Sequence, residues 1–333
     1  MKSGKKSFSF KERSFNMKKI SVIFTGGTIS TLACDGIMDL EQSKKFELIE
    51  KYKKTDKNIE FETETPYFIL SENLSGEHFA KLYVCVKKAL ETDCDGIIIT
   101  HGTDTLQYSA SAIDVMLGKP NKPIVFVSSN YPLQNQKANG FDNFVGAARF
   151  IKQINDGGVF VSYKNSGENL KIHTAENLLE HNCYSDELKS INNNFYGEFS
   201  ENNVFSKNPC FNENKKYTSF ENVKISKKSP VLRLKCCPGM DYPSIDGKKC
   251  VVIETYHSGT LKTDDGEFFE FVYKAESLNI PIVLTGLSNG DIYESAKSIA
   301  ENKNIIMSKY SPIYTYIKCW ILAENGLDIK ANL

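Results

Sequence analysis

Two short segments carry hydroxyl and carboxylate side chains in turns that contain glycine. Thr25-Gly26-Gly27-Thr28 follows the apolar run 19–24, and His101-Gly102-Thr103-Asp104-Thr105 follows the apolar run 96–100. Glycine permits a positive φ and lets backbone N–H groups face a ligand. A threonine hydroxyl in such a turn could attack a carbonyl carbon while nearby amides stabilise the oxyanion. Acyl transfer is therefore one chemistry that these residue types indicate.

Each segment also has a purely structural interpretation. Thr28 could cap a backbone group in a strand-to-loop turn, and Thr103 with Asp104 could form the N-cap of a helix over 106–117. In the functional interpretation, Asp104 binds a substrate ammonium group and Thr103 positions or activates water. The functional interpretation gains weight because both segments lie at the ends of expected strands.

Strands and helices alternate along the chain in a pattern that must position these turns. A parallel α/β sheet is expected, and its sites gather at the carboxyl ends of the strands. We expect a larger N-terminal domain with a mostly parallel sheet and flanking helices, and a smaller C-terminal α/β domain. The expected boundaries are a disordered basic tail over 1–16, a catalytic domain over 17–190, an Asn-rich linker or crossing segment over 191–224, and a second domain over 225–333. The expected strands are 19–24, 96–100, 123–128, 158–163, 231–235, 249–255 and 281–285, and the expected helices are 76–91, 106–117, 141–154, 265–278, 291–302 and 312–323.

Composition excludes several classes of protein. The 333 residues carry 41 Lys plus Arg against 41 Asp plus Glu, and only Arg13, Arg149 and Arg233 are arginines. A neutral, arginine-poor chain is a poor binder of nucleic acid. No apolar run is long enough to span a membrane, and residues 1–16 lack the apolar core of a secretory signal. Nine cysteines without metal-ligand spacing are typical of reduced thiols, so a cytoplasmic location and no metal site are expected.

The two turn segments resemble the paired signatures of the bacterial-type L-asparaginase family, in particular its cytosolic type I branch. The resemblance covers residues 18 to about 325 and includes Ser71-Glu72-Asn73, Ser128-Ser129-Asn130-Tyr131-Pro132, Cys237-Pro238-Gly239 and Glu254-Thr255-Tyr256-His257-Ser258-Gly259. It implies hydrolysis of L-asparagine to L-aspartate and ammonia through a threonine ester, with neither a metal nor an organic cofactor. It also implies a homodimer or homotetramer that acts on a small amino-acid substrate.

The resemblance assigns a role to each matching residue. Thr28 matches the nucleophile, and Thr103 matches a second catalytic threonine. Asp104 matches a carboxylate that moves protons and holds the α-amino group. The remaining matches are the substrate-binding residues Ser71, Glu72, Gly27 and Gly102 and the catalytic lysine, Lys171 in Leu170-Lys171-Ile172-His173-Thr174. His101 is expected to order its turn and not to act as a base.

The sequence departs from the family in the expected lid. Residues 31–45 contain no tyrosine, whereas several family members use a lid tyrosine to activate the nucleophile. Loss of a proton-transfer group commonly costs about 10²–10⁴ in rate, so weak or altered activity is one expectation. Three other interpretations stay open: an enzyme for another amide such as glutamine, a non-catalytic amino-acid-binding protein, and the related amidotransferase subunit that supplies ammonia to a partner on transfer RNA. We expect that subunit to carry an added N-terminal domain and a more basic surface.

Overall fold

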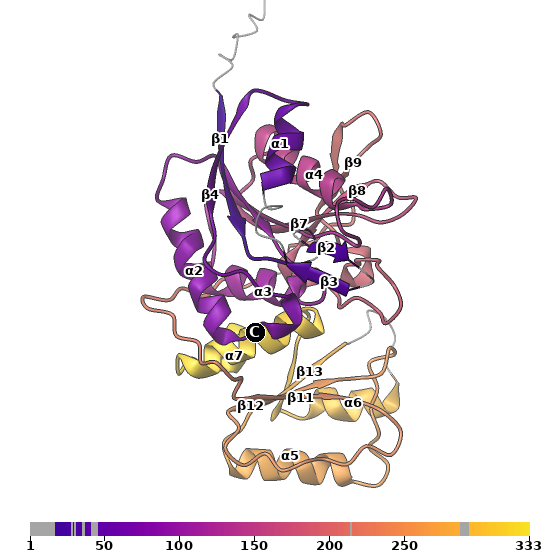
Figure 1. The fold of residues 1–333 in the computed structure, drawn as a ribbon. Coiled ribbons are helices and arrows are strands. Elements are labelled where there is room, and N and C mark those ends of the chain that lie inside the picture. The colour runs from indigo at the N-terminus through magenta and orange to yellow at the C-terminus, as the bar shows by residue number, and fades with distance from the viewer. Residues whose placement is uncertain are drawn as a thin grey trace, which may run out of the picture.

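A computed structural model describes residues 17–27, 29, 31–34, 37–40, 46–213, 215–286 and 293–333. The basic tail expected over residues 1–16 lies outside the described residues. The described chain forms two α/β domains, each built on its own sheet (Figure 1). Within this part of the chain, no helix has both the length and the apolar composition needed to cross a bilayer.

The larger sheet has eight strands in the order β10-β9-β8-β7-β6-β5-β1-β4. The pairs from β4 through β1, β5 and β6 to β7 are parallel, whereas β8, β9 and β10 extend the sheet in antiparallel pairing. The central strands are runs of Ile, Val and Phe that are buried on both faces, as parallel strands covered by helices must be. The strands are β1 Lys18–Phe24, β4 Ile59–Glu64, β5 Gly96–Thr100, β6 Pro123–Val127, β7 Gly158–Lys164, β8 Leu170–Thr174, β9 Gly197–Phe199 and β10 Phe205–Lys207.

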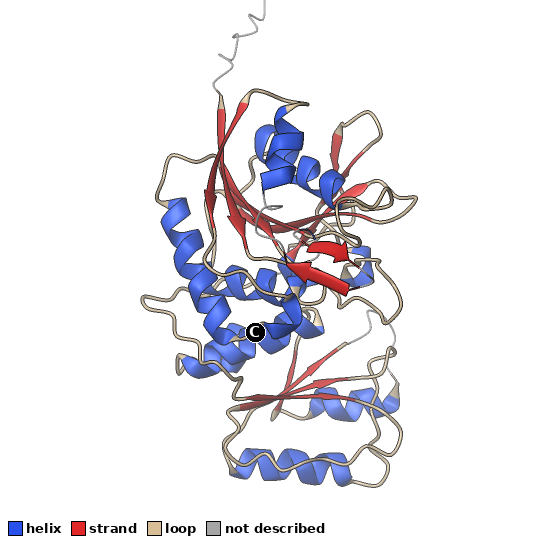
Figure 2. Ribbon diagram, in the orientation of Figure 1, coloured by secondary structure: helices blue, strands red, loops and turns tan. Residues whose placement is uncertain are grey.

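Helices cover both faces of the larger sheet (Figure 2). The helices α1 (Glu47–Lys53) and α4 (Gly140–Gln153) pack on one face, and α2 (Gly76–Leu90) and α3 (Leu106–Leu117) pack on the other. The start of α2 is fixed by a capping box, in which the side chains of Ser75 and His78 satisfy backbone N–H groups reciprocally.

The smaller sheet contains four parallel strands, β11 (Val231–Lys235), β12 (Cys250–Glu254), β13 (Ile282–Thr285) and β14 (Ile305–Met307). One of its faces packs against α5 (Glu267–Ser277) and α6 (Glu294–Glu301). The helix α7 (Pro312–Glu324) lies between the two sheets and contacts α3, β11 and β12 (Figure 1). A continuous apolar core joins the domains through it, and the chain ends in α8 (Ile329–Asn332). The expected two-domain α/β fold is confirmed.

The Asn-rich segment differs from the expected linker, because it supplies β9 and β10 to the larger sheet. Although the segment is mostly polar, it contains aromatic residues that pack against one another. Two of them, Tyr196 and Phe199, are buried in the core beneath α4. Part of the expected lid likewise forms a two-stranded antiparallel sheet, β2 (Thr31–Cys34) with β3 (Ile37–Leu40). Short strands of this kind carry too little periodic signal to be recognised from the sequence.

Candidate functional site

The carboxyl ends of β1 and β5 bring the two glycine-containing turns together. The hydroxyl of Thr25 donates a hydrogen bond of 2.7 Å to the carbonyl of Thr100, which links the two strand ends. The N–H of Gly27 donates to the carbonyl of Ile69 at 3.1 Å, just before the short 3₁₀ helix Ser71–Asn73. Three segments therefore meet at one edge of the sheet, as expected for a parallel α/β site. Thr28, the predicted nucleophile, lies outside the described residues.

Glycine is required where these three segments touch. Gly27 has a φ of +80°, and a Cβ atom built there would lie 2.2 Å from the backbone of Gly102. A Cβ atom on Gly102 would in turn lie 2.4 Å from the side chain of Ser71. The glycines predicted to contact substrate thus also allow the turns to approach each other.

Replacing Gly27 by alanine is expected to lower the free energy of unfolding by about 1–3 kcal/mol, because the new methyl group meets backbone atoms at a strained φ. Gly326 is the matched control, since it has a φ of +66° but no atom within 4 Å of the position that a Cβ would take. Urea unfolding of both alanine variants measures the difference. Equal losses at the two positions would contradict the packing role of Gly27.

The side chains of Thr103 and Asp104 do not cap α3. The N-cap residue is Thr105, which makes no side-chain cap hydrogen bond. The hydroxyl of Thr103 donates to the carbonyl of Ser129 at 2.9 Å, and the Asp104 carboxylate accepts a long hydrogen bond of 3.4 Å from the hydroxyl of Ser71. Asp104 is exposed, whereas Ser71 is buried. The expected capping role of these two side chains is therefore wrong, and their functional role stays a prediction.

Glu72 and Lys171 are the other two predicted site residues. Glu72 is exposed on the 3₁₀ helix beside Ser71. Lys171 lies on β8 opposite Tyr163, and its ammonium group is bonded to Glu168 at 2.7 Å and lies 5.1 Å from the ring centre of Phe195. The ammonium group of Lys171 is therefore bonded to the turn between β7 and β8, and none of its contacts with described residues is with Thr103.

A cavity of about 780 Å³ opens beside the Thr103–Asp104 turn. One wall is this turn with the first turn of α3, and another wall is the loop 180–186. The lining residues are Thr103, Asp104, Thr105, Gln107, Tyr108, Asn130, Glu180, His181, Asn182, Cys183, Tyr184, Ser185 and Asp186. The arrangement presents a hydroxyl, a carboxylate and an imidazole to one space, which suits a small polar ligand.

His181 is a cavity residue that no pattern in the sequence singles out. Its Nδ1 lies 3.1 Å from the carbonyl of Glu187, which only accepts, so Nδ1 carries the proton and Nε2 is the acceptor. Nε2 is enclosed and has no hydrogen-bond partner among the described residues. Burial lowers the pKa of His181 despite the nearby Asp186 and Asp104, so the ring is neutral at pH 7.

Two other histidines are buried structural groups. His101 lies with Nδ1 2.8 Å from the carbonyl of Gly102 and Nε2 2.8 Å from the hydroxyl of Ser109, in agreement with its expected role in ordering the turn. His173 lies 2.8 Å from the hydroxyl of Ser190. Burial lowers the pKa of His101 to about 4 and that of His173 to about 3.

Acid is expected to destabilise the protein through these two histidines. Both folded pKa values lie below the unfolded value of about 6.5, so the unfolded chain binds more protons in between. The contribution of the two neutral histidines to stability is therefore fully present above about pH 6.5. The free energy of unfolding then falls by up to about 1.4 kcal/mol per pH unit for each histidine as the pH drops towards 4. When urea unfolding is measured between pH 7.5 and 4.5, the free energy of unfolding should fall less steeply with decreasing pH in His101→Gln than in the wild type. The exposed His257 is the control position, and an unchanged slope in His101→Gln would contradict the assignment.

No group of three or more His, Cys, Asp or Glu side chains in the described part of the chain is arranged to hold a metal ion.

Comparison with known proteins gives the context of this site. The family model described as "Asparaginase, N-terminal" matches residues 19–210. A glutamyl-tRNA(Gln) amidotransferase subunit of Methanobrevibacter smithii is 27% identical over 93% of this chain and 73% of its own length, and the corresponding protein of Sulfolobus acidocaldarius is 25% identical over 93% and 72%.

Solved structures show the same fold. The thermostable L-asparaginase from Thermococcus kodakarensis superposes with a TM-score of 0.73 at 21% identity, covering 94% of this chain and 96% of that one. L-asparaginase I from Vibrio cholerae gives 0.75 at 18% identity, covering 94% and 95%. The family match spans more than half of the chain and includes both glycine-containing turns and the 3₁₀ helix between them. The chain therefore belongs to the asparaginase family.

Proposed function

We propose that this protein hydrolyses L-asparagine to L-aspartate and ammonia through a threonine acyl-enzyme. The observation that carries the proposal is the meeting of Ser71, Thr103 and Asp104 at the carboxyl ends of the strands in an asparaginase-family chain. The exposed carboxylate of Asp104 suits a substrate ammonium group, and the hydroxyl of Thr103 lies on the same cavity wall.

In this proposal each residue has a defined task. The Thr28 hydroxyl attacks the side-chain amide carbon, the C–N bond breaks, and the amine leaves as ammonia after it takes up a proton. Water then cleaves the ester to give L-aspartate. Thr103 and Asp104 position groups and transfer protons, while Ser71 and Glu72 hold the α-carboxylate and α-amino groups. Lys171 transfers protons once its ammonium group leaves Glu168. None of these steps uses a metal or an organic cofactor.

A second candidate is an amidase that releases ammonia from glutamine or from another amide. It is favoured by the amidotransferase subunits among the curated relatives. In that case ammonia would pass to a partner protein, as in an amidotransferase.

Ammonia release from asparagine and from glutamine by the purified protein separates these candidates. Release from asparagine that is lost in Thr28→Ala supports the first proposal, and release from glutamine alone supports the second. Tight aspartate binding without turnover of either amide would overturn both and favour a binding protein. Release that is unaffected by Lys171→Met would remove Lys171 from the mechanism and leave the other roles standing.

We also propose a cytoplasmic homodimer or homotetramer. Closed symmetric assemblies are the commonest state of soluble oligomeric enzymes, and the eight cysteines whose side chains the structure describes are all free, as in a reducing compartment. Light scattering coupled to size exclusion gives the assembly mass, and a monomer at micromolar concentration would contradict this proposal.

A further inference from the structure

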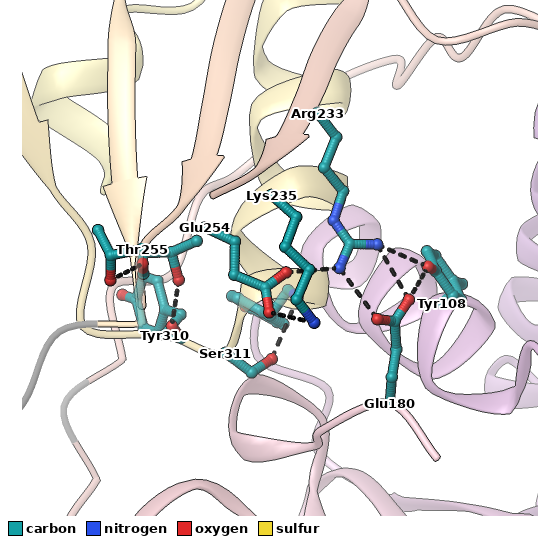
Figure 3. A network of polar contacts seen from close by, with 10 residues as sticks. Tyr108, Glu180, Arg233, Lys235, Glu254, Thr255, Tyr310 and Ser311 are labelled. Carbon is teal, nitrogen blue, oxygen red and sulfur yellow. Dashed lines mark hydrogen bonds and ion pairs between the residues drawn. The ribbon is translucent and has the colours of Figure 1, made fainter. Parts of the chain in front are cut away.

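Arg233 joins the smaller domain to the wall of the cavity. It lies on β11, and its guanidinium group crosses to the larger domain (Figure 3). The two terminal nitrogens donate to the two carboxylate oxygens of Glu180 at 2.9 and 3.0 Å, and one of them also donates to the hydroxyl of Tyr108 at 2.9 Å. The hydroxyl of Tyr108 donates in turn to Glu180. A single side chain thus binds two residues that line the cavity.

These two residues come from two different segments that line the cavity. Tyr108 is in the first turn of α3, three residues after Thr105, and so continues the turn that carries Thr103 and Asp104. Glu180 begins the loop 180–186 and directly precedes His181. The guanidinium group therefore holds the Thr103–Asp104 turn and the loop 180–186 at a fixed separation.

The charge balance around Arg233 supports a fixed geometry. Its side chain is 22% exposed, and Glu254 on the neighbouring strand β12 accepts from it at 3.1 Å, which anchors it to its own domain. Burial opposes ionisation of Glu180, but hydrogen bonds from Arg233 and Tyr108 lower its pKa, so it is a carboxylate at pH 7. Paired contacts of this kind need the planar fork of arginine, and lysine offers only one ammonium group.

We propose that Arg233 is a positioning residue for the candidate site, and that it sets the width of the cavity by holding Tyr108 and Glu180 together. The inference rests on the proposed function, because it concerns the same cavity. Loss of Arg233 leaves only the hydrogen bond from Tyr108 to Glu180 between the Thr103–Asp104 turn and the loop 180–186, so the loop loosens and substrate binding weakens more than the chemical step does.

Two measurements test this role, and one of them needs no activity. Hydrogen–deuterium exchange of the peptide over 178–188 should be faster in Arg233→Met than in the wild type, because Glu180 has lost its two hydrogen bonds from Arg233. The KM for the amide substrate should rise by about tenfold or more while kcat changes by less than about threefold. Arg233→Lys should give an intermediate KM, and Glu180→Gln should reproduce the effect from the other side of the pair.

Lys235→Met is the matched control. Lys235 belongs to the same cluster and lies 3.5 Å from Glu254, but it is exposed and makes no described contact with Tyr108 or Glu180. Its substitution should leave both the exchange rate and the KM at wild-type values. Unchanged exchange of 178–188 in a folded Arg233→Met protein, or in Glu180→Gln, would overturn the inference. A wild-type protein that releases no ammonia would overturn the proposed function alone, since the exchange experiment still reports on Arg233.

Discussion

Replacement of Thr103 by valine is expected to lower kcat for amide hydrolysis by about 10²–10⁴-fold, the usual contribution of a proton-transfer group. Valine has nearly the same shape as threonine but lacks the hydroxyl that bonds to Ser129 at 2.9 Å. Thr103 is only partly buried, so the fold should survive the change. Steady-state ammonia release gives kcat, and calorimetry of aspartate binding shows whether the cavity is intact.

A structural role for Thr103 predicts a different result. If the hydroxyl only ties the turn to Ser129, binding and stability should fall together and kcat should stay within about threefold of the wild type. Thr92→Val is a suitable control, because the Thr92 hydroxyl also donates to a backbone carbonyl, that of Ala89, at a position after α2 that is not on the cavity wall. Near-wild-type turnover in Thr103→Val would exclude Thr103 from the chemistry.

The sequence predicts the central elements well because they obey simple periodic rules. The runs over 97–99 and 124–127 contain only Ile, Val and Phe, and they form the centres of the parallel strands β5 and β6, which are buried on both faces. The expected helix over 106–117 matches α3. Placing the glycine-containing turns at the ends of β1 and β5 then needs only the rule that parallel strands end at one edge of the sheet.

The remaining contacts of the site depend on partners far apart in the chain. Arg233 reaches Glu180 across 53 residues and Tyr108 across 125, and no local pattern marks any of the three. The contacts of Lys171 are equally hard to predict from the sequence, although its partner is only three residues away. Its motif resembles that of a catalytic lysine, but the turn before β8 places Glu168 within 2.7 Å of the ammonium group. Side-chain pairing of this kind is decided by tertiary packing and not by residue spacing.

A buried ionic cluster attaches α7 to the larger domain. Asp114 of α3 is fully buried and accepts hydrogen bonds from Lys215 at 2.5 Å and from the hydroxyl of Tyr314 at 2.7 Å. Glu176 lies 3.6 Å from the same ammonium group. Three segments that are distant in sequence therefore meet at one carboxylate. Burial lowers the pKa of the neighbouring Lys318 to about 8, which shows how strongly this region disfavours an unpaired charge.

Replacement of Asp114 by alanine is expected to lower the free energy of unfolding by about 3–5 kcal/mol, because it leaves the buried charge of Lys215 without its closest partner. Urea unfolding measures the loss, and Asp114→Asn separates the effect of charge from that of the cavity left by alanine.

The control is Asp142→Asn, which breaks an exposed ion pair with Lys164 and should cost less than about 1 kcal/mol. Removal of both charges in an Asp114→Leu, Lys215→Met double variant should recover part of the loss, since a buried pair costs more to break than to replace. Equal effects of Asp114→Asn and Asp142→Asn would mean that the cluster contributes no more to stability than a surface ion pair does.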